Sequence, residues 1–239
     1  MDGYDSPTCY TDVTFTDGSA YSAPCAFTFS SDNTASYTRT VSNHWATLCL
    51  PFAFSADNST ARFYSVKSYA DGNIAVEPIT GIIAAGTPVL AYIADGNEFS
   101  VTATGAAAVA EAKQLSELKG AFAQTNVADE DYIIANDHFW NAGWLKQNND
   151  AVKNVYVAPY RASLSLTSTE AKPNSISIDL GETDGIDSIE ATDPSAFLDG
   201  EVTDPSVSFY DLQGRRLTAP QRGMIIIRKG GVSRKVIVK

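Results

Sequence analysis

The chain has 239 residues, of which 44% are hydrophobic and 10% aromatic, so it can bury a sizeable core. Residues 1–204 carry nine Lys/Arg and 27 acids, a net of -18, whereas residues 205–239 carry eight Lys/Arg and one acid, a net of +7. The acidic body lacks the basic residues that neutralise phosphates, which excludes nucleic acid as the main partner. No run of about 18 apolar residues occurs, so no membrane-spanning helix is predicted.

The N-terminal segment predicts short strands. It opens with MDGYDSPTCY, which contains no secretory hydrophobic region, and we interpret it as a mature start from which any signal peptide has been removed. Alternating runs that end in turn residues predict strands within 12–18 and 25–31. A longer β-rich run within 36–54 stops at Pro51.

Two hairpins are predicted on the same tripeptide, Asp-Gly-Asn. The first lies at 71–73 and the second at 95–97, each between alternating apolar runs. Asp-Gly is a strong signal for a short hairpin turn. The repeated device predicts a meander within one sheet.

One helix is predicted, over GAAAVAEAKQLSELKG at 105–120, because good helix formers lie between flanking glycines. The remaining apolar runs of the body predict further strands. These runs are 120–127, 131–146, 154–168 and 175–180. Frequent short strands separated by turns are typical of a sandwich or a barrel.

The amino-acid composition changes after Leu180. Between Glu182 and Asp204 there are eight acids and no base, with two Asp-Pro steps, which indicates an acidic linker. Beyond it, alternating runs around Gly214 and Gly230 predict three strands. The sequence therefore predicts an all-β chain with three parts. They are a β-sandwich, or two small β-modules, over 1–181, an acidic linker over 182–204, and a three-stranded C-terminal β-module over 205–239.

The cysteine set is odd in number. Cys9 and Cys25 lie in polar stretches and are candidates for a disulfide in an exported protein. Cys49 lies within TLCLPF, which is typical of a small buried hydrophobic residue.

Catalytic chemistry has little support in the sequence. His44 or His138 could pair with Cys49, but a nucleophilic thiolate needs an exposed, electropositive pocket, which this apolar run does not predict. We interpret Glu77 and the acidic residues at 129–131 as solvated charges in turns rather than as the pair of catalytic carboxylates of a glycosidase. We predict no catalytic residue and no enzyme activity.

Metal ligands and cofactors are not predicted either. The chain has no CxxC or Cys/His spacing typical of a zinc site, and no EF-hand loop. A weak calcium site of mixed carbonyls and carboxylates stays an alternative.

The best candidate ligand site is NDHFWNAGW, residues 136–144. Trp140 and Trp144 are suited to stack on sugar rings, with Asn136 and His138 supplying hydrogen bonds beside them. A packing role is the alternative: the strand ends at Trp140, residues 141–143 turn, and Trp144 packs back on the hairpin.

The basic tail contains three ordered elements, FYDLQGRRL, RGMIIIRKG and RKVIVK. Together they resemble the type IX-like C-terminal sorting module of exported Bacteroidetes proteins, although Ile225 stands where an aromatic residue is commoner. The matching positions are Tyr210, Asp211 and Gly214, then Gly223 to Ile227, then Lys235 to Lys239. The resemblance implies export. Separately, the alternation of Arg and Lys with Ile and Val predicts basic residues beside turns and on the outer face of a small sheet.

The body carries a second set of ordered motifs, which is similar to a module near the C-termini of Bacteroidetes surface proteins, including leucine-rich-repeat adhesin-like proteins. The motifs are WATLCLPF at 45–52, GTPVL at 86–90 and PYRA at 159–162. This resemblance implies no enzymatic activity.

Composition, motifs and resemblances together predict a secreted or cell-surface protein of a host-associated bacterium, peripheral to the outer membrane surface. Its expected role is a non-catalytic structural or adhesion module, whose partner is a glycan or a surface protein. The alternative is a carbohydrate-binding protein that uses the aromatic cluster at 138–144.

Overall fold

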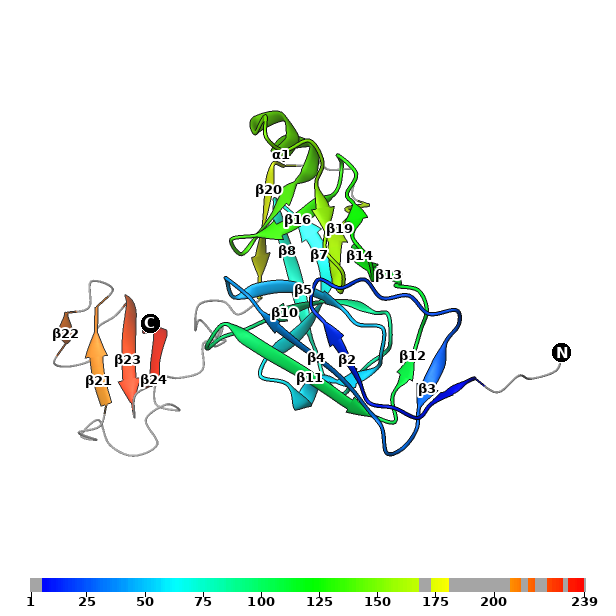
Figure 1. Cartoon of the computed structure of the whole chain (residues 1–239). Coiled ribbons are helices and arrows are strands. Elements are labelled where there is room, and N and C mark those ends of the chain that lie inside the picture. The colour runs from blue at the N-terminus through cyan, green and yellow to red at the C-terminus, as the bar shows by residue number, and fades with distance from the viewer. Residues whose placement is uncertain are drawn as a thin grey trace. The chain divides into compact units, whose positions relative to one another are not determined.

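A computed structural model describes residues 6–167, 173–180, 207–211, 215–217, 223–229 and 232–238 of the chain. The chain divides into two compact units, Met1–Asp179 and Leu180–Lys239. Strands dominate both units, which confirms the predicted all-β fold (Figure 1). The acidic linker predicted over 182–204 lies outside the described residues.

The first unit is built on a long curled sheet. Within the described residues it has ten strands, antiparallel except where β20 runs parallel to β8. In spatial order they are β13 (Gln114–Leu115), β14 (Leu118–Ala121), β19 (Arg161–Leu164), β16 (Tyr132–Ala135), β17 (His138–Asn141), β20 (Ser175–Asp179), β8 (Asn73–Ile79), β7 (Arg62–Ala70), β10 (Pro88–Tyr92) and β5 (Trp45–Cys49).

Smaller sheets complete this unit. One has the order β11 (Glu98–Thr104), β4 (Thr34–Thr40) and β2 (Val13–Thr16), and another has the order β1 (Thr8–Cys9), β3 (Phe27–Phe29) and β12 (Ala107–Ala108). Two pairs are formed by β15 (Thr125–Asn126) with β18 (Tyr156–Val157) and by β6 (Phe54–Ser55) with β9 (Ile82–Ile83). The helical segments in the described part of the chain are η1 (Ala56–Asn58) and α1 (Ala142–Asn148), and α1 lies at one end of the unit, in contact with β17 (Figure 1).

The main core lies between the β11-β4-β2 sheet and the β7-β10-β5 part of the long sheet. Phe99 of β11 meets Phe63 of β7 across it, with ring centroids 6.5 Å apart. Strand β4 alternates, so Ala35, Tyr37 and Arg39 are buried while their neighbours are more exposed. This packing is consistent with the predicted β-sandwich.

Strand β5 is buried along its whole length, because sheets cover both of its faces. Cys49 at its end has no exposed surface, which confirms the prediction of a buried small residue.

The first predicted hairpin is correct and the second is wrong. Ala70 pairs with Asn73 across a two-residue turn, in which Asp71 and Gly72 have φ of 50° and 77°. That geometry suits an Asp-Gly turn. At 95–97 the chain instead leaves β10 for β11 in a different sheet, so the two strands do not pair. Turn chemistry alone does not decide whether flanking strands stay together.

The helix predicted over 105–120 is also wrong, because this segment forms β12, β13 and β14. Leu118 is buried and pairs with Leu164, whereas Leu115 is half exposed across the short β13-β14 hairpin. Gly120 lies against Cys49, where any Cβ would collide with the sulfur atom. Tertiary contacts of the small residues therefore override their helix propensity.

The second unit is a four-stranded sheet in its described residues, with the order β22 (Arg216–Leu217), β21 (Val207–Tyr210), β23 (Gly223–Lys229) and β24 (Val232–Val238). Three of these strands were predicted, and β22 is an additional edge strand of two residues. Arg215 pairs with Asp211 at 2.6 Å. Among the described residues of the whole chain, no helix is long and apolar enough to span a membrane.

Candidate functional site

The candidate ligand site lies on the β16-β17 hairpin. Ala135 pairs with His138, and the turn residues Asn136 and Asp137 have φ of 51° and 61°. Asn and Asp tolerate this left-handed conformation better than most residues, so the local sequence favours a tight turn. Because side chains alternate along β17, the buried Phe139 faces the core and its neighbours face outward.

Trp140 and Trp144 form a stacked pair, with ring centroids 5.5 Å apart and an interplanar angle of 28°. Trp140 belongs to β17, whereas Trp144 belongs to α1. The indole Nε1–H of Trp140 donates to the Ala135 carbonyl at 3.0 Å, which fixes the ring over the hairpin. Both indoles are partly exposed, so their apolar rings contribute to the surface of the first unit.

Helix α1 replaces the turn predicted at 141–143. Asn141 caps the helix, since its side-chain oxygen accepts a hydrogen bond from the Trp144 N–H at 2.8 Å. Trp144 therefore does pack back on the hairpin, but from a helix of seven residues.

Exposed His138 extends the aromatic surface, with its ring centroid 6.5 Å from that of Trp140. Its Nδ1 lies 2.9 Å from the Asn136 carbonyl oxygen. The predicted site residues Asn136, His138, Trp140 and Trp144 thus share one hairpin and the adjoining helix turn. Asp137 does not join them, because its carboxylate accepts a hydrogen bond from the Trp45 N–H at 2.7 Å. We name His138, Trp140 and Trp144 the aromatic surface.

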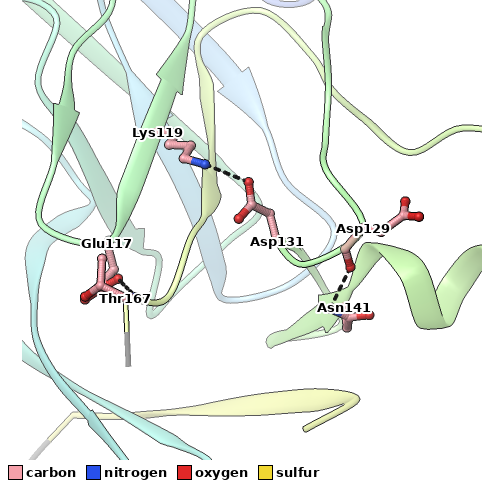
Figure 2. A network of polar contacts seen from close by, with 6 residues as sticks. All are labelled: Glu117, Lys119, Asp129, Asp131, Asn141 and Thr167. Carbon is pink, nitrogen blue, oxygen red and sulfur yellow. Dashed lines mark hydrogen bonds and ion pairs between the residues drawn. The ribbon is translucent and has the colours of Figure 1, made fainter. Parts of the chain in front are cut away.

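A polar network holds α1 in place (Figure 2). Asn141 donates from Nδ2 to the Asp129 carbonyl oxygen at 3.0 Å, and the same oxygen accepts from the Gly143 N–H. Asp131 pairs with Lys119 at 2.9 Å and is 3% exposed. The prediction that Asp131 is a solvated turn charge is therefore wrong. Its carboxylate lies inside the fold because β14 brings a lysine to it.

The aromatic surface rests on a buried tyrosine. Tyr132 of β16 has no exposed surface, and its hydroxyl donates to the Pro173 carbonyl at 3.0 Å. Burial, with smaller effects of its neighbours, raises the pKa of Tyr132 to about 12. The buried side of the hairpin is thus hydrogen-bonded to the segment at Pro173, while Trp140 lies on its outer side.

Two of the side chains considered for nucleophilic catalysis, Cys49 and His44, have structural roles. Cys49 Sγ donates to the Gly86 carbonyl at 3.3 Å, and burial raises the pKa of this thiol to about 12. It is therefore protonated at neutral pH. His44 Nδ1 lies 2.8 Å from the Ile93 carbonyl oxygen, at the other end of β5. A strand of that length separates the two residues by about 16 Å, too far for a Cys-His pair.

The two cysteines considered for a disulfide line one cavity. Cys9 and Cys25 are free thiols in this structure, and both border a cavity of about 610 Å³ beside β2. Their pairing stays a prediction. In the described part of the chain, no group of three His, Cys, Asp or Glu side chains could hold a metal ion.

The three motif segments of the body meet at β5. Strand β10, which contains part of GTPVL, pairs with β5 along its length, from Pro88 opposite Cys49 to Tyr92 opposite Trp45. On the other side, the Ala162 N–H of the PYRA segment donates to Thr47 Oγ1 at 3.0 Å. These segments lie far apart in the sequence, and they form one structural unit.

No protein-family model, curated protein or solved structure matches this chain. Its function is therefore inferred from its own residues and their arrangement.

A second polar site was missed at the sequence level. Arg161 pairs with Asp17 at 3.2 Å, although the two residues are 144 positions apart, and Asp17 also accepts a hydrogen bond from the Tyr37 hydroxyl at 2.7 Å. These three side chains, together with the buried Arg39 of β4, are named the arginine cluster. One signal was present: Arg39 occupies an inward position of the alternating run TASYTRT, where an apolar residue is the rule.

Proposed function

We propose that this chain is a non-catalytic binding module of the adhesive class, exported to the surface of a host-associated bacterium. One observation carries the non-catalytic part. Cys49 and His44, the thiol and one of the two imidazoles considered for catalysis, each contact a backbone carbonyl at opposite ends of β5. Their roles are to pack and to fix the backbone.

The proposal of export is supported by the C-terminal unit. The three elements that resemble a sorting module fall on β21, β23 and β24, which are neighbours in one sheet. Deleting residues 205–239 tests this part in cells that express the intact chain. Surface proteolysis should detect the intact protein on the cells and the shortened protein inside them. Equal surface exposure of both would refute a sorting role.

The aromatic surface favours carbohydrate as the ligand. Stacked Trp140 and Trp144 present an apolar face beside the exposed imidazole of His138, on a hairpin that a buried tyrosine anchors. Sugars bind such faces through their C–H groups, and polar neighbours select among the hydroxyls. A rigid aromatic face also loses little conformational entropy on binding.

A glycan array tests the carbohydrate proposal. Wild-type protein should bind a defined set of glycans, and Trp140→Ala and Trp144→Ala should each abolish binding while circular dichroism stays unchanged. Tyr10→Ala is the matched control, because Tyr10 is 76% exposed and lies outside the aromatic surface. Binding that survives both tryptophan substitutions would reject the aromatic surface as the contact.

A further inference from the structure

One edge of the first unit is open. Strand β2 forms one end of the sheet β11-β4-β2, so one side of this strand has no neighbouring strand. Strand β1, which precedes it in the chain, likewise forms one end of the sheet β1-β3-β12. Each of the two runs parallel to its partner, β1 to β3 and β2 to β4. Both strands therefore present a free side.

The register of β4 shows which groups of β2 lie on its free side. The Val41 N–H donates to the opposite Asn97 carbonyl at 2.7 Å, so the odd-numbered residues of β4 bond to β11. The even-numbered residues of β4 therefore bond to β2, at the main-chain groups of Val13 and Phe15. Thr14 lies between these two, so its N–H and C=O point away from β4.

Two further threonines have the same orientation. The Thr16 carbonyl accepts a hydrogen bond from the Ser19 N–H at 3.0 Å, on the side away from β4, as the alternation requires. In β1, the carbonyls of Pro7 and Cys9 accept hydrogen bonds from the β3 chain, each at 2.9 Å. Thr8 lies between them, so its main-chain groups point away from β3.

This edge lacks the usual protection against pairing. Among the described residues, the main-chain groups of Thr8 and Thr14 form no hydrogen bond with another main chain on the free side. Natural proteins cover such edges, or place lysine, proline or a bulge there. Strand β2 has the sequence VTFT, which contains neither lysine nor proline and favours the extended conformation. It is therefore suited to accept another strand.

A groove runs along the open edge. The cavity of about 610 Å³ is lined by residues 7–9 and by every residue of β2. A cavity over one face of a strand would be lined by alternate residues, so consecutive lining residues place this cavity along the edge. All seven residues of the segment 19–25 also line it, and they form its other wall. We name this cavity the edge groove.

The segment 19–25 does not close the edge. Its Tyr21 N–H donates to the Phe122 carbonyl at 2.8 Å rather than to β2. In the part of the chain that the structure describes, the Ser19 N–H makes the only main-chain hydrogen bond from this segment to β2. The rings of Phe15 and Tyr21 are in contact, with centroids 5.5 Å apart, and both line the groove. The edge groove thus combines unpaired main-chain groups with an aromatic lining.

The groove selects for one kind of occupant. None of its described lining residues is charged, so a charged side chain would lie there without a counter-charge. The four residues of β2 span about 13 Å, the length of about four extended residues. Because the segment 19–25 forms the other wall, a second folded sheet cannot join edge to edge. A single extended, uncharged segment matches both the charge and the shape.

We propose that the edge groove binds an uncharged, extended peptide segment of a partner protein, which adds a strand to β2. The peptide main chain hydrogen-bonds to the N–H and C=O of Thr14 and to the N–H of Thr16. Alternate peptide side chains enter the groove. In this mode, main-chain hydrogen bonds supply affinity and side-chain pockets supply specificity. The edge groove is separate from the aromatic surface and does not depend on the glycan proposal.

An array of N-acetylated pentapeptide amides tests the proposal with the full chain in reducing buffer. Sequences composed of Thr, Val, Ala, Ser and Phe should include saturable binders. The best of them should bind Trp140→Ala as well as wild type, since that tryptophan lies outside the groove. The same sequence with a central Glu or Lys should bind about tenfold more weakly or worse. No binder, or equal binding of the charged versions, overturns the proposal.

N-methylation of the best peptide tests the mode of binding. Each methyl group replaces one main-chain N–H, and the nitrogens are methylated one at a time. Every second position should lose about tenfold in affinity, because only alternate residues of an added strand bond to β2. The positions between them should tolerate the change. A loss without this alternation would mean that side chains alone hold the peptide.

Two variants at one position test the edge from the side of the protein. Thr14→Pro removes an N–H that points away from β4, so the pairing of β2 with β4 should persist and circular dichroism should stay unchanged. Thr14→Val is the matched control, because it also loses the hydroxyl contact with Ser36 but keeps the N–H. Thr14→Pro should bind the peptide about tenfold more weakly than Thr14→Val. Equal affinities of the two variants contradict the proposal.

Thiol protection shows where the peptide binds. Cys9 and Cys25 line the edge groove and are partly exposed and exposed, respectively. A saturating concentration of the best peptide should slow maleimide labelling of both thiols in the reduced protein. The peptide methylated at a critical nitrogen, at the same concentration, should leave the labelling rates unchanged. Binding of the unmethylated peptide without protection of either thiol would place it outside the groove and overturn the proposal.

Discussion

The aromatic surface and the arginine cluster differ in how they are built. Three residues within a stretch of seven form the aromatic surface, and they come from one hairpin and the helix that follows it. The arginine cluster draws on segments up to 144 residues apart. One exposes apolar rings to solvent, and the other holds charges within the fold. The difference shows that a local site can be recognised in a sequence, whereas a site assembled by sheet packing becomes visible only in the fold.

The largest expected effect is on the arginine cluster. Asp17→Ala leaves Arg39 beside Arg161 without a counter-charge and deprives the Tyr37 hydroxyl of its acceptor. We expect the free energy of unfolding to fall by about 3 kcal/mol. Urea denaturation measures this loss, with the exposed Asp32→Ala as the control. A loss under about 1 kcal/mol would mean that Asp17 does not balance the two cations.

A smaller effect is expected on the aromatic surface. Trp144→Ala removes one ring of the stacked pair, and it should lower the free energy of unfolding by about 1 to 2 kcal/mol. Exposed His138→Ala should change it by less than about 0.5 kcal/mol. Chemical denaturation of both variants gives the comparison. A Trp144→Ala loss as large as that of Asp17→Ala would place the main structural role at the aromatic surface instead.

The two regions should respond alike to alkali. Burial raises the pKa of Tyr132, beneath the aromatic surface, and of Tyr160, beside the arginine cluster, each from 10.0 to about 12. Burial likewise raises the pKa of Cys49 from 9.0 to about 12. The folded chain therefore keeps protons that the unfolded chain releases, so stability is retained below about pH 9 and declines between about pH 9 and 12.

Unfolding by urea at stepped alkaline pH measures this decline. Tyr132→Phe and Tyr160→Phe should each make it shallower. Stability that stays flat across the window would contradict the assigned shifts.

Some elements of the fold could be predicted from the sequence and others could not, for physical reasons. The Asp71-Gly72 hairpin was predictable because its turn and its strand pairing agree. Helix α1 was not, because seven residues give almost no periodic signal and its Asn141 cap resembles a turn residue. The segment at 105–120 was predicted as a helix because its alanines are good helix formers. It forms strands instead, and the close approach of its backbone to Cys49 requires a glycine at position 120.

The same holds for the aromatic surface and the arginine cluster: the first could be predicted from the sequence and the second could not. His138, Trp140 and Trp144 were identified correctly as neighbours, since a hairpin brings nearby residues together. The pairing of Arg161 with Asp17 depends on how β19 meets the end of β2, which no local pattern encodes.

The smallest expected effect on stability is that of thiol labelling, because the labelled side chains lie at the surface and the fold stays intact. Cys25 is exposed, Cys9 is partly exposed and Cys49 is buried. A maleimide should label Cys25 fastest and leave Cys49 unmodified until the chain unfolds, as peptide mapping would reveal. In protein recovered from an oxidising compartment, labelling of Cys9 and Cys25 only after reduction would establish the predicted disulfide. Labelling of both without reduction would refute it.

The most direct test of the central claim is a tryptophan fluorescence titration. The chain has three tryptophans, and Trp45→Phe leaves Trp140 and Trp144 as the only indole reporters, with buried Trp45 replaced conservatively. Titration with the glycan best bound on the array should give a saturable change in emission. The same change should vanish when His138→Ala and Trp144→Phe are added. Glycan binding without any change in emission would contradict the aromatic surface as the ligand contact.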